Sequence, residues 1–188
     1  MAILKDNFMS FEDYINLRNN SDEIIEYLDG VVCMSPSPST QHQRISAKLT
    51  MEFMMFLKGK SCEVFAAPYD IELYKDGIDG KKIVIPDLSV ICNKDGFTEN
   101  KYIGVPTLIV EILSPSNQAH DLVTKLNIYM KYGVKEYWIV NPMKESITVY
   151  TLDDNGYYEQ EAVESHKGII NSKIFTGFNI ELEYLFNR

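Results

Sequence analysis

A strand–helix–strand pattern in the middle of the chain constrains its fold most. An apolar run extends from Pro106 to Leu113, apolar residues then recur at helical spacing from Asp121 to Tyr132, and Gly133 follows as a helix stop. A second apolar run, Glu136 to Val140, comes directly after it. Two strands joined by one helix form a βαβ-like unit. The pattern predicts an α/β or α+β fold with a central mixed β-sheet flanked by helices.

The rest of the chain supplies further strands and one long helix. Ser10 precedes two acidic residues and is typical of a helix N-cap. An Asp29-Gly30 pair between two apolar runs indicates a β-hairpin over Glu23 to Met34. The other predicted elements are a helix from Ser39 or Thr40 to Lys58, strands at Cys62 to Tyr74, Lys82 to Cys92 and Ser146 to Leu152, and a Tyr-rich strand after Gly156. The loop between the first two of these strands carries two Asp-Gly pairs, which predicts a second hairpin.

The composition suits one domain. Of the 188 residues, 45% are hydrophobic, enough for one core, so we expect a single domain over residues 1–188. No run of about 18 apolar residues is present, so we expect no membrane-spanning helix. The first ten residues carry an acid and lack a long apolar core, which makes them a poor signal peptide. Cys33, Cys62 and Cys92 have no CxxC spacing, and we expect reduced thiols in a cytoplasmic protein.

The net charge argues against binding to DNA through bulk electrostatics. The chain has 18 Lys and Arg against 27 Asp and Glu, a formal net charge of −9. The charge is uneven, however, because the segment 39–60 contains Arg44, Lys48, Lys58 and Lys60 against one acid. Such a segment is typical of the solvated face of a helix, and the net charge alone does not exclude a nucleic-acid enzyme.

Two acidic residues interrupt apolar runs, where a charge is costly. Asp87 lies within Ile83–Ile91 and Glu111 within Leu108–Leu113, and strand alternation would place each on a buried face. One such acid could pair with a structural Arg or Lys. Two acids on neighbouring strands repel each other unless a positive group lies between them. A divalent ion bound by hard oxygen ligands meets that requirement, so the pair is a candidate metal site.

Lys125 is the candidate cationic residue. It lies three residues after Leu122 and flanks the apolar stripe of the predicted helix, so its side chain can lean toward the sheet. Asp121, four residues before it on the same side, makes an ordinary Asp–Lys helix pair the alternative. In the functional interpretation, Lys125 orients a water nucleophile or stabilises charge in a transition state.

Six short motifs follow one another along the chain. They are Ile25 to Gly30, Met34 to Gln43, Pro86-Asp87, Val110 to Ser116, Asp121 to Leu126, and Tyr132 to Pro142. In this order they resemble the Uma2 family of the PD-(D/E)xK restriction-endonuclease-like superfamily. The resemblance extends over nearly the whole chain, from Ser10 to Phe186.

The resemblance implies a restriction-endonuclease-like fold and an endodeoxyribonuclease, a hydrolase that cleaves phosphodiester bonds of DNA with Mg²⁺ or Mn²⁺. It also implies a homodimer. The implied site consists of the metal ligands Asp87, Glu111 and Glu26, the catalytic lysine Lys125, and His42 and Gln43 toward the substrate. The residue two positions after Glu111 is Leu113 instead of the lysine of the superfamily's (D/E)xK element. The resemblance to Uma2 proteins implies that this lysine lies on the following helix, where Lys125 fits the position.

A catalytically silent module is the alternative, a chain of the same fold that binds a protein or nucleic-acid partner. Asp87 and Glu111 favour the enzyme, because a silent scaffold would gain stability if valines replaced these buried acids. The acidic net charge favours the silent module, or a substrate other than long duplex DNA.

Overall fold

The computed structural model of the chain describes residues 2–3, 8–35, 37–114 and 120–187. Its helices are α1 (Phe11–Asn19), α2 (Thr40–Leu57), the π-helix η1 (His120–Lys125), α3 (Leu126–Tyr132) and α4 (Leu182–Phe186). Its strands are β1 (Ala2–Ile3), β2 (Ile24–Leu28), β3 (Val31–Ser35), β4 (Glu63–Ala66), β5 (Asp70–Leu73), β6 (Lys82–Val84), β7 (Leu88–Ile91), β8 (Lys101–Gly104), β9 (Leu108–Ile112), β10 (Glu136–Asn141), β11 (Ser146–Leu152), β12 (Tyr158–Ser165), β13 (Ile169–Asn171) and β14 (Asn179–Glu181). None of the helices in these ranges is long and apolar enough to cross a membrane.

Local sequence signals set the ends of several helices. Ser10 caps α1 by accepting a hydrogen bond from the backbone N–H of Asp13 at 3.1 Å. Ser39 caps α2 in the same way, with the N–H of His42 at 3.2 Å. Gly133 ends α3 in the left-handed conformation, with a φ of 93°. The helix starts and stops predicted at these residues are confirmed.

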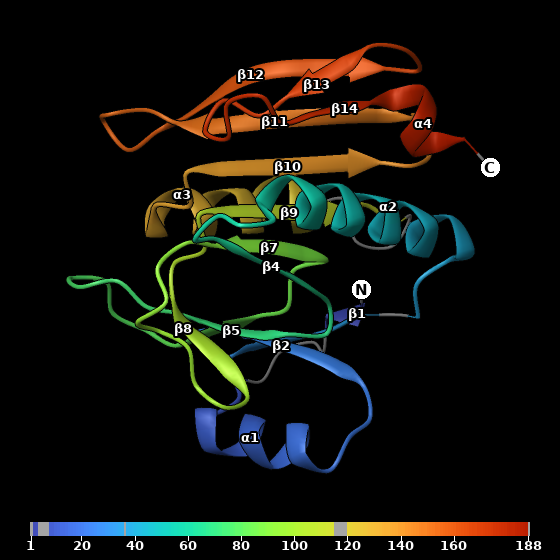
Figure 1. Cartoon of the computed structure of the whole chain (residues 1–188). Coiled ribbons are helices and arrows are strands. Elements are labelled where there is room, and N and C mark those ends of the chain that lie inside the picture. Colours follow the sequence, from blue (N-terminus) through green and yellow to red (C-terminus); the bar gives the residue numbers. More distant parts are fainter. Residues whose placement is uncertain (1, 4–7, 36, 115–119, 188) are drawn as a thin grey trace.

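The N-terminal half contributes a six-stranded sheet, sheet A, whose described strands have the order β1-β3-β2-β6-β5-β8. The first predicted hairpin is its β2–β3 pair, and the turn residues Asp29 and Gly30 both have positive φ, 49° and 98°, as a tight hairpin requires. The second predicted hairpin is the antiparallel β5–β6 pair. Helix α1 covers one face of sheet A (Figure 1). In the core beneath it, Tyr14 packs against Ile25 and Tyr27.

Sheet B is the central layer, with the order β12-β11-β10-β9-β7-β4 among its described strands. Strands β9 and β10 run parallel and are connected through η1 and α3, which confirms the βαβ unit. Helix α2 packs on one face of sheet B through Ile45, Leu49 and Phe53. Helix α3 and sheet A cover the other face, where Tyr129 and Tyr132 are buried. The mixed sheet flanked by helices that the sequence predicted is therefore confirmed, and an apolar core lies on each side of it.

The C-terminal segment completes the core between α2 and sheet B. The ring of Phe178, just before β14, stacks on Phe53 of α2 with the centroids 4.0 Å apart. Lys48 of α2 donates hydrogen bonds to the carbonyl oxygens of Tyr184 and Asn187, at 2.7 and 2.9 Å, at the end of α4. This base of the segment 39–60 therefore caps a helix.

The predicted strand Lys82–Cys92 is two strands in different sheets, β6 in sheet A and β7 in sheet B. Pro86 lies between them and has no backbone N–H, so it cannot continue a ladder of hydrogen bonds. Asp87 lies in this crossing, directly before β7, and its predicted position on a strand face is wrong. The predicted strand Cys62–Tyr74 divides around Pro68 into β4 of sheet B and β5 of sheet A. The chain thus crosses between the two sheets at both places.

The predicted helix Asp121–Tyr132 begins with the π-helical turn η1 and continues as α3. Short π-helical segments are rare and often occur at functional sites, and this one ends at Lys125. The side chain of Asp121 lies outside the described residues, and so does the alternative Asp121–Lys125 pair. The last two residues of the motif Val110 to Ser116 also lie outside them.

Cys62 and Cys92 form a disulfide bond, so the prediction of reduced thiols is wrong for these two residues. They are 30 positions apart in the sequence. Strands β4 and β7 pair antiparallel with Glu63 opposite Ile91, which puts the residue before Glu63 and the residue after Ile91 face to face. Cys33 is a buried thiol. The cysteines therefore no longer indicate a cytoplasmic location.

Candidate active site

The pairing of β7 with β9 brings Asp87 next to Glu111. Leu88 of β7 pairs with Val110 of β9 in an antiparallel register, so the residue before Leu88 and the residue after Val110 lie opposite each other. The Oδ2 atom of Asp87 accepts a hydrogen bond from the backbone N–H of Ile112 at 2.7 Å. The two acids that interrupt apolar runs in the sequence therefore meet where β7 begins and β9 ends.

Glu26 reaches the same region from sheet A. On β2, Ile25 and Tyr27 belong to the cluster beneath α1, so alternation turns Glu26 toward sheet B. Its side chain is 1% exposed, and its Oε1 accepts a hydrogen bond from the backbone N–H of Ile85 at 2.8 Å. Ile85 begins the crossing that ends at Asp87, so one short segment contacts Glu26 and carries a second site acid.

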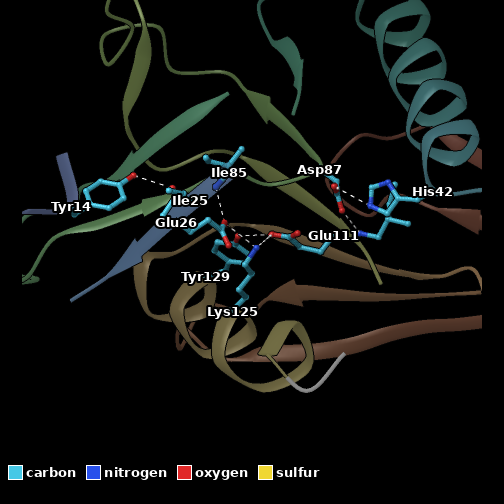
Figure 2. Close-up of polar contacts among 10 residues, drawn as sticks. Tyr14, Ile25, Glu26, His42, Ile85, Asp87, Glu111, Lys125 and Tyr129 are labelled. Carbon is cyan, nitrogen blue, oxygen red and sulfur yellow. Dashed lines mark hydrogen bonds and ion pairs between the residues drawn. The ribbon is translucent and has the colours of Figure 1, made fainter. Parts of the chain in front are cut away.

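Lys125 joins the two sheets. Its side chain is 5% exposed, and its Nζ lies 3.0 Å from Oε1 of Glu26 and 2.9 Å from Oε1 of Glu111. Figure 2 shows Glu111 between Glu26 on one side and Asp87 with His42 on the other, with Lys125 reaching up from the helix. Repulsion between buried acids predicts a positive group among them. Between Glu26 and Glu111, that group is the ammonium of Lys125.

Tyr129 is a site residue that the sequence analysis missed, because it was counted only as part of an apolar stripe. It follows Lys125 by one helical turn and is fully buried. Its hydroxyl donates a hydrogen bond to Oε1 of Glu111 at 2.7 Å. Burial, followed by the charge of Glu111, raises the pKa of Tyr129 well above its ordinary value of 10.0. The phenol therefore stays protonated and acts as a hydrogen-bond donor at neutral pH.

His42 lies beside Asp87, whereas Gln43 does not reach the acids. From the first turn of α2, the Nε2 of His42 lies 3.2 Å from Oδ1 of Asp87. The side chains of His42 and Asp87 are 12% and 19% exposed, more than those of Glu26 and Lys125, so the site is most accessible at this end. Gln43 is exposed, and among the described residues its side chain has no hydrogen bond to the site acids.

The acids supply ligands suited to a hard divalent cation, although they do not form a closed cluster. Among the described residues, no group of three His, Cys, Asp or Glu side chains is placed to hold a metal ion. Mg²⁺ usually binds one or two carboxylates and keeps several waters, so the neighbouring Asp87 and Glu111 are ligands of the right kind. The Oε2 of Glu26 is buried and has no hydrogen-bond partner within the described structure, a costly state that a nearby cation would relieve. The donor set therefore fits Mg²⁺ or Mn²⁺.

Two proteins of Synechocystis sp. (strain ATCC 27184 / PCC 6803 / Kazusa) are similar to the chain in sequence. The uncharacterized protein slr1290 is 29% identical over 149 residues, which cover 79% of this chain and 76% of the relative. The uncharacterized protein sll1609 is 23% identical over 144 residues, which cover 75% of this chain and 79% of the relative.

A solved structure shares the fold. It is the crystal structure from Anabaena variabilis ATCC 29413 described as "a putative nuclease belonging to DUF820". The TM-score is 0.73 over 95% of this chain and 97% of that chain, at 18% sequence identity. The likeness shows that the two chains have the same architecture.

The sequence model of the Uma2 family, described as "Putative restriction endonuclease", matches residues 11–183, almost the entire chain. The matched residues include all of the acids at the site, Lys125 and Tyr129. The family identified from the six sequence motifs is confirmed. The chain therefore belongs to the Uma2 family, and it combines a nuclease-like fold with a buried cluster of acids around one lysine.

Proposed function

We propose that this chain is a divalent-cation-dependent endonuclease that hydrolyses phosphodiester bonds of DNA. The observation that carries the proposal is that Asp87 and Lys125 both lie next to Glu111 between the two sheets. Apolar side chains of similar volume would give this place at least equal stability, since buried charges lose their hydration. The charged cluster is therefore better explained by chemistry than by folding.

The side chains would divide the chemical work among them. Asp87 and Glu111 would hold Mg²⁺ or Mn²⁺, with Glu26 as a further ligand. When bound, the cation would offset negative charge on the phosphate and make a bound water more acidic. Lys125 would supply a fixed positive charge close to the place where negative charge develops on the phosphate. Since Glu26 and Glu111 already hold its ammonium in position, little reorganisation would be needed.

The substrate would enter from the side of His42 and Asp87. These two side chains are the more exposed ones of the site, and Glu26, Glu111 and Lys125 lie deeper. His42 would then be the first side chain of the site to meet a phosphate. Contacts with DNA phosphates release condensed counterions, so we expect an affinity that falls steeply with salt.

A paired titration and cleavage experiment tests the proposal. Mn²⁺ and Mg²⁺ are titrated calorimetrically into the wild type, Asp87→Asn, Glu111→Gln and the control Glu72→Gln. Glu72 is a carboxylate of β5 that binds Lys81 and Lys101 and lies outside the site. The same four proteins are incubated with supercoiled plasmid and with single-stranded DNA, with either cation or with EDTA. We expect binding and cleavage in the wild type and in Glu72→Gln, and neither in the two site variants.

A different result would favour the silent module. Lys125 already offsets the charges of Glu26 and Glu111, and this observation supports a scaffold that needs no metal. A wild type that binds neither cation and cleaves neither DNA would contradict the proposed activity. Binding of labelled DNA at several salt concentrations would then test the module, because flat salt dependence excludes contacts with phosphates. The homodimer remains a prediction, which light scattering after size-exclusion chromatography checks.

A further inference from the structure

Tyr129 and Lys125 contact the same oxygen atom. The hydroxyl of Tyr129 donates to Oε1 of Glu111 at 2.7 Å, and the Nζ of Lys125 lies 2.9 Å from that atom. The two residues are four positions apart on adjoining helical turns, so they face the sheet together. Figure 2 shows both side chains directed at Glu111 from the helix below it. The carboxylate is therefore held at one oxygen by two donors from one element.

The tyrosine hydroxyl has a single proton to donate. It donates that proton to Oε1 of Glu111 at 2.7 Å. A lysine ammonium has three donors about a rotatable bond, and Lys125 divides its contacts between Glu26 and Glu111. Of the two donors, Tyr129 is thus the one whose bond to Glu111 has a fixed direction.

The ring of Tyr129 is held independently of its hydroxyl. It packs against the ring of Tyr137 edge to face, with centroids 5.1 Å apart and planes at 72°, inside the core between α3 and sheet B. Phenylalanine at this position would keep these contacts and remove only the bond to Glu111. The hydroxyl therefore contributes little to the packing of the ring and acts mainly on the carboxylate.

We infer that Tyr129 is a positioning residue that fixes the orientation of the Glu111 carboxylate toward the cation. The inference rests on the proposed function, because it takes Glu111 as a metal ligand. Carboxylates that bind metals are commonly held by hydrogen bonds from a surrounding layer of residues, and loss of such a bond typically weakens metal binding or activity about 10- to 100-fold. The bond from Tyr129 to Glu111 has this geometry.

The test compares Tyr129→Phe with Tyr158→Phe. Tyr158 is a suitable control because it lies in the same aromatic cluster, and its hydroxyl donates to the backbone carbonyl of Val134 at 2.9 Å without touching a site acid. Mn²⁺ affinity is measured by calorimetry for the wild type, both variants and Asp87→Asn, after circular dichroism has established that each is folded. We expect Tyr129→Phe to bind Mn²⁺ about 10- to 100-fold more weakly and Tyr158→Phe to bind it as the wild type does.

The other possible results would contradict either the positioning role of Tyr129 alone or the proposed function as well. Equal losses in Tyr129→Phe and Tyr158→Phe would mean that any missing buried hydroxyl loosens the site, so Tyr129 would have no specific role. Unchanged affinity in Tyr129→Phe, with binding abolished in Asp87→Asn, would exclude the positioning role and leave the proposed function intact. A wild type that does not bind Mn²⁺ would remove the proposed function and the positioning role together.

Discussion

Replacement of Lys125 by methionine should destabilise the protein, because it leaves two buried carboxylates facing each other. Methionine preserves most of the side-chain volume but removes the ammonium that lies 3.0 Å from Glu26 and 2.9 Å from Glu111. The two carboxylate oxygens are at most about 6 Å apart by these contacts, so their repulsion at an effective dielectric constant of about 20 is at least about 3 kcal/mol. Measured losses on breaking buried ion pairs are about 3–5 kcal/mol. We therefore expect Lys125→Met to lower the free energy of unfolding by about 3–5 kcal/mol at pH 7.

Urea unfolding in EDTA, followed by circular dichroism, measures the effect. With a slope of about 2 kcal/mol/M, the loss corresponds to a midpoint lower by roughly 2 M. The double variant Lys125→Met/Glu26→Gln removes one of the two facing charges, so we expect it to be more stable than Lys125→Met alone, with a coupling of about 1–3 kcal/mol. The reasoning is refuted if Lys125→Met matches the wild type, or if Glu26→Gln destabilises it further.

Three further changes test features away from this pair. Burial alone would raise the pKa of Glu72, but hydrogen bonds from two lysines hold it below the ordinary value of 4.5. The carboxylate of Glu72 therefore stabilises the fold fully above its pKa in the unfolded chain, and this stabilisation is lost as the pH falls through its lower pKa in the folded protein. Urea unfolding should show that the free energy of unfolding falls less between about pH 5 and pH 3 in Glu72→Gln than in the wild type. The Cys62–Cys92 bond closes a loop of 30 residues, so its reduction should lower the free energy of unfolding by about 3–4 kcal/mol. Thiol titration of the denatured, unreduced protein should detect one thiol among the three cysteines. Glu136 is buried and accepts a bond from Nε1 of Trp138 at 2.6 Å, and methionine at this position has no acceptor oxygen. Glu136→Met should therefore cost roughly 2–4 kcal/mol and shift the fluorescence of this single tryptophan; an unchanged spectrum would show that the bond is absent.

The elements that sequence predicted correctly have strong local signals. Ser39 and Gly133 mark helix ends through backbone hydrogen bonds and a positive φ, which depend on neighbouring residues alone. Asp87 and Glu111 were found because a charge inside an apolar run is costly wherever the run folds. Their positions next to each other follow from the pairing of β7 with β9. The sequence therefore predicts the acids of the site better than their geometry.

The features that sequence missed depend on contacts between distant segments. Strand alternation continues through Pro86, so the pattern does not reveal that the chain changes sheets there. The Cys62–Cys92 bond depends on the register of β4 and β7. Tyr129 has the spacing of a core residue, and only the position of Glu111 on another element gives its hydroxyl a partner. Strands β13 and β14 have three residues each, too few for a periodic pattern.

The site lies at the contact between the two sheets, so its geometry depends on how one sheet packs on the other. Glu26 comes from sheet A, Glu111 from sheet B, and Lys125 contacts both. A small separation of the sheets would part these groups while each sheet kept its own hydrogen bonds. Partial opening of this kind requires less free energy than global unfolding. Activity should therefore disappear at lower urea concentrations than secondary structure does, so the protein would become inert before it becomes unfolded.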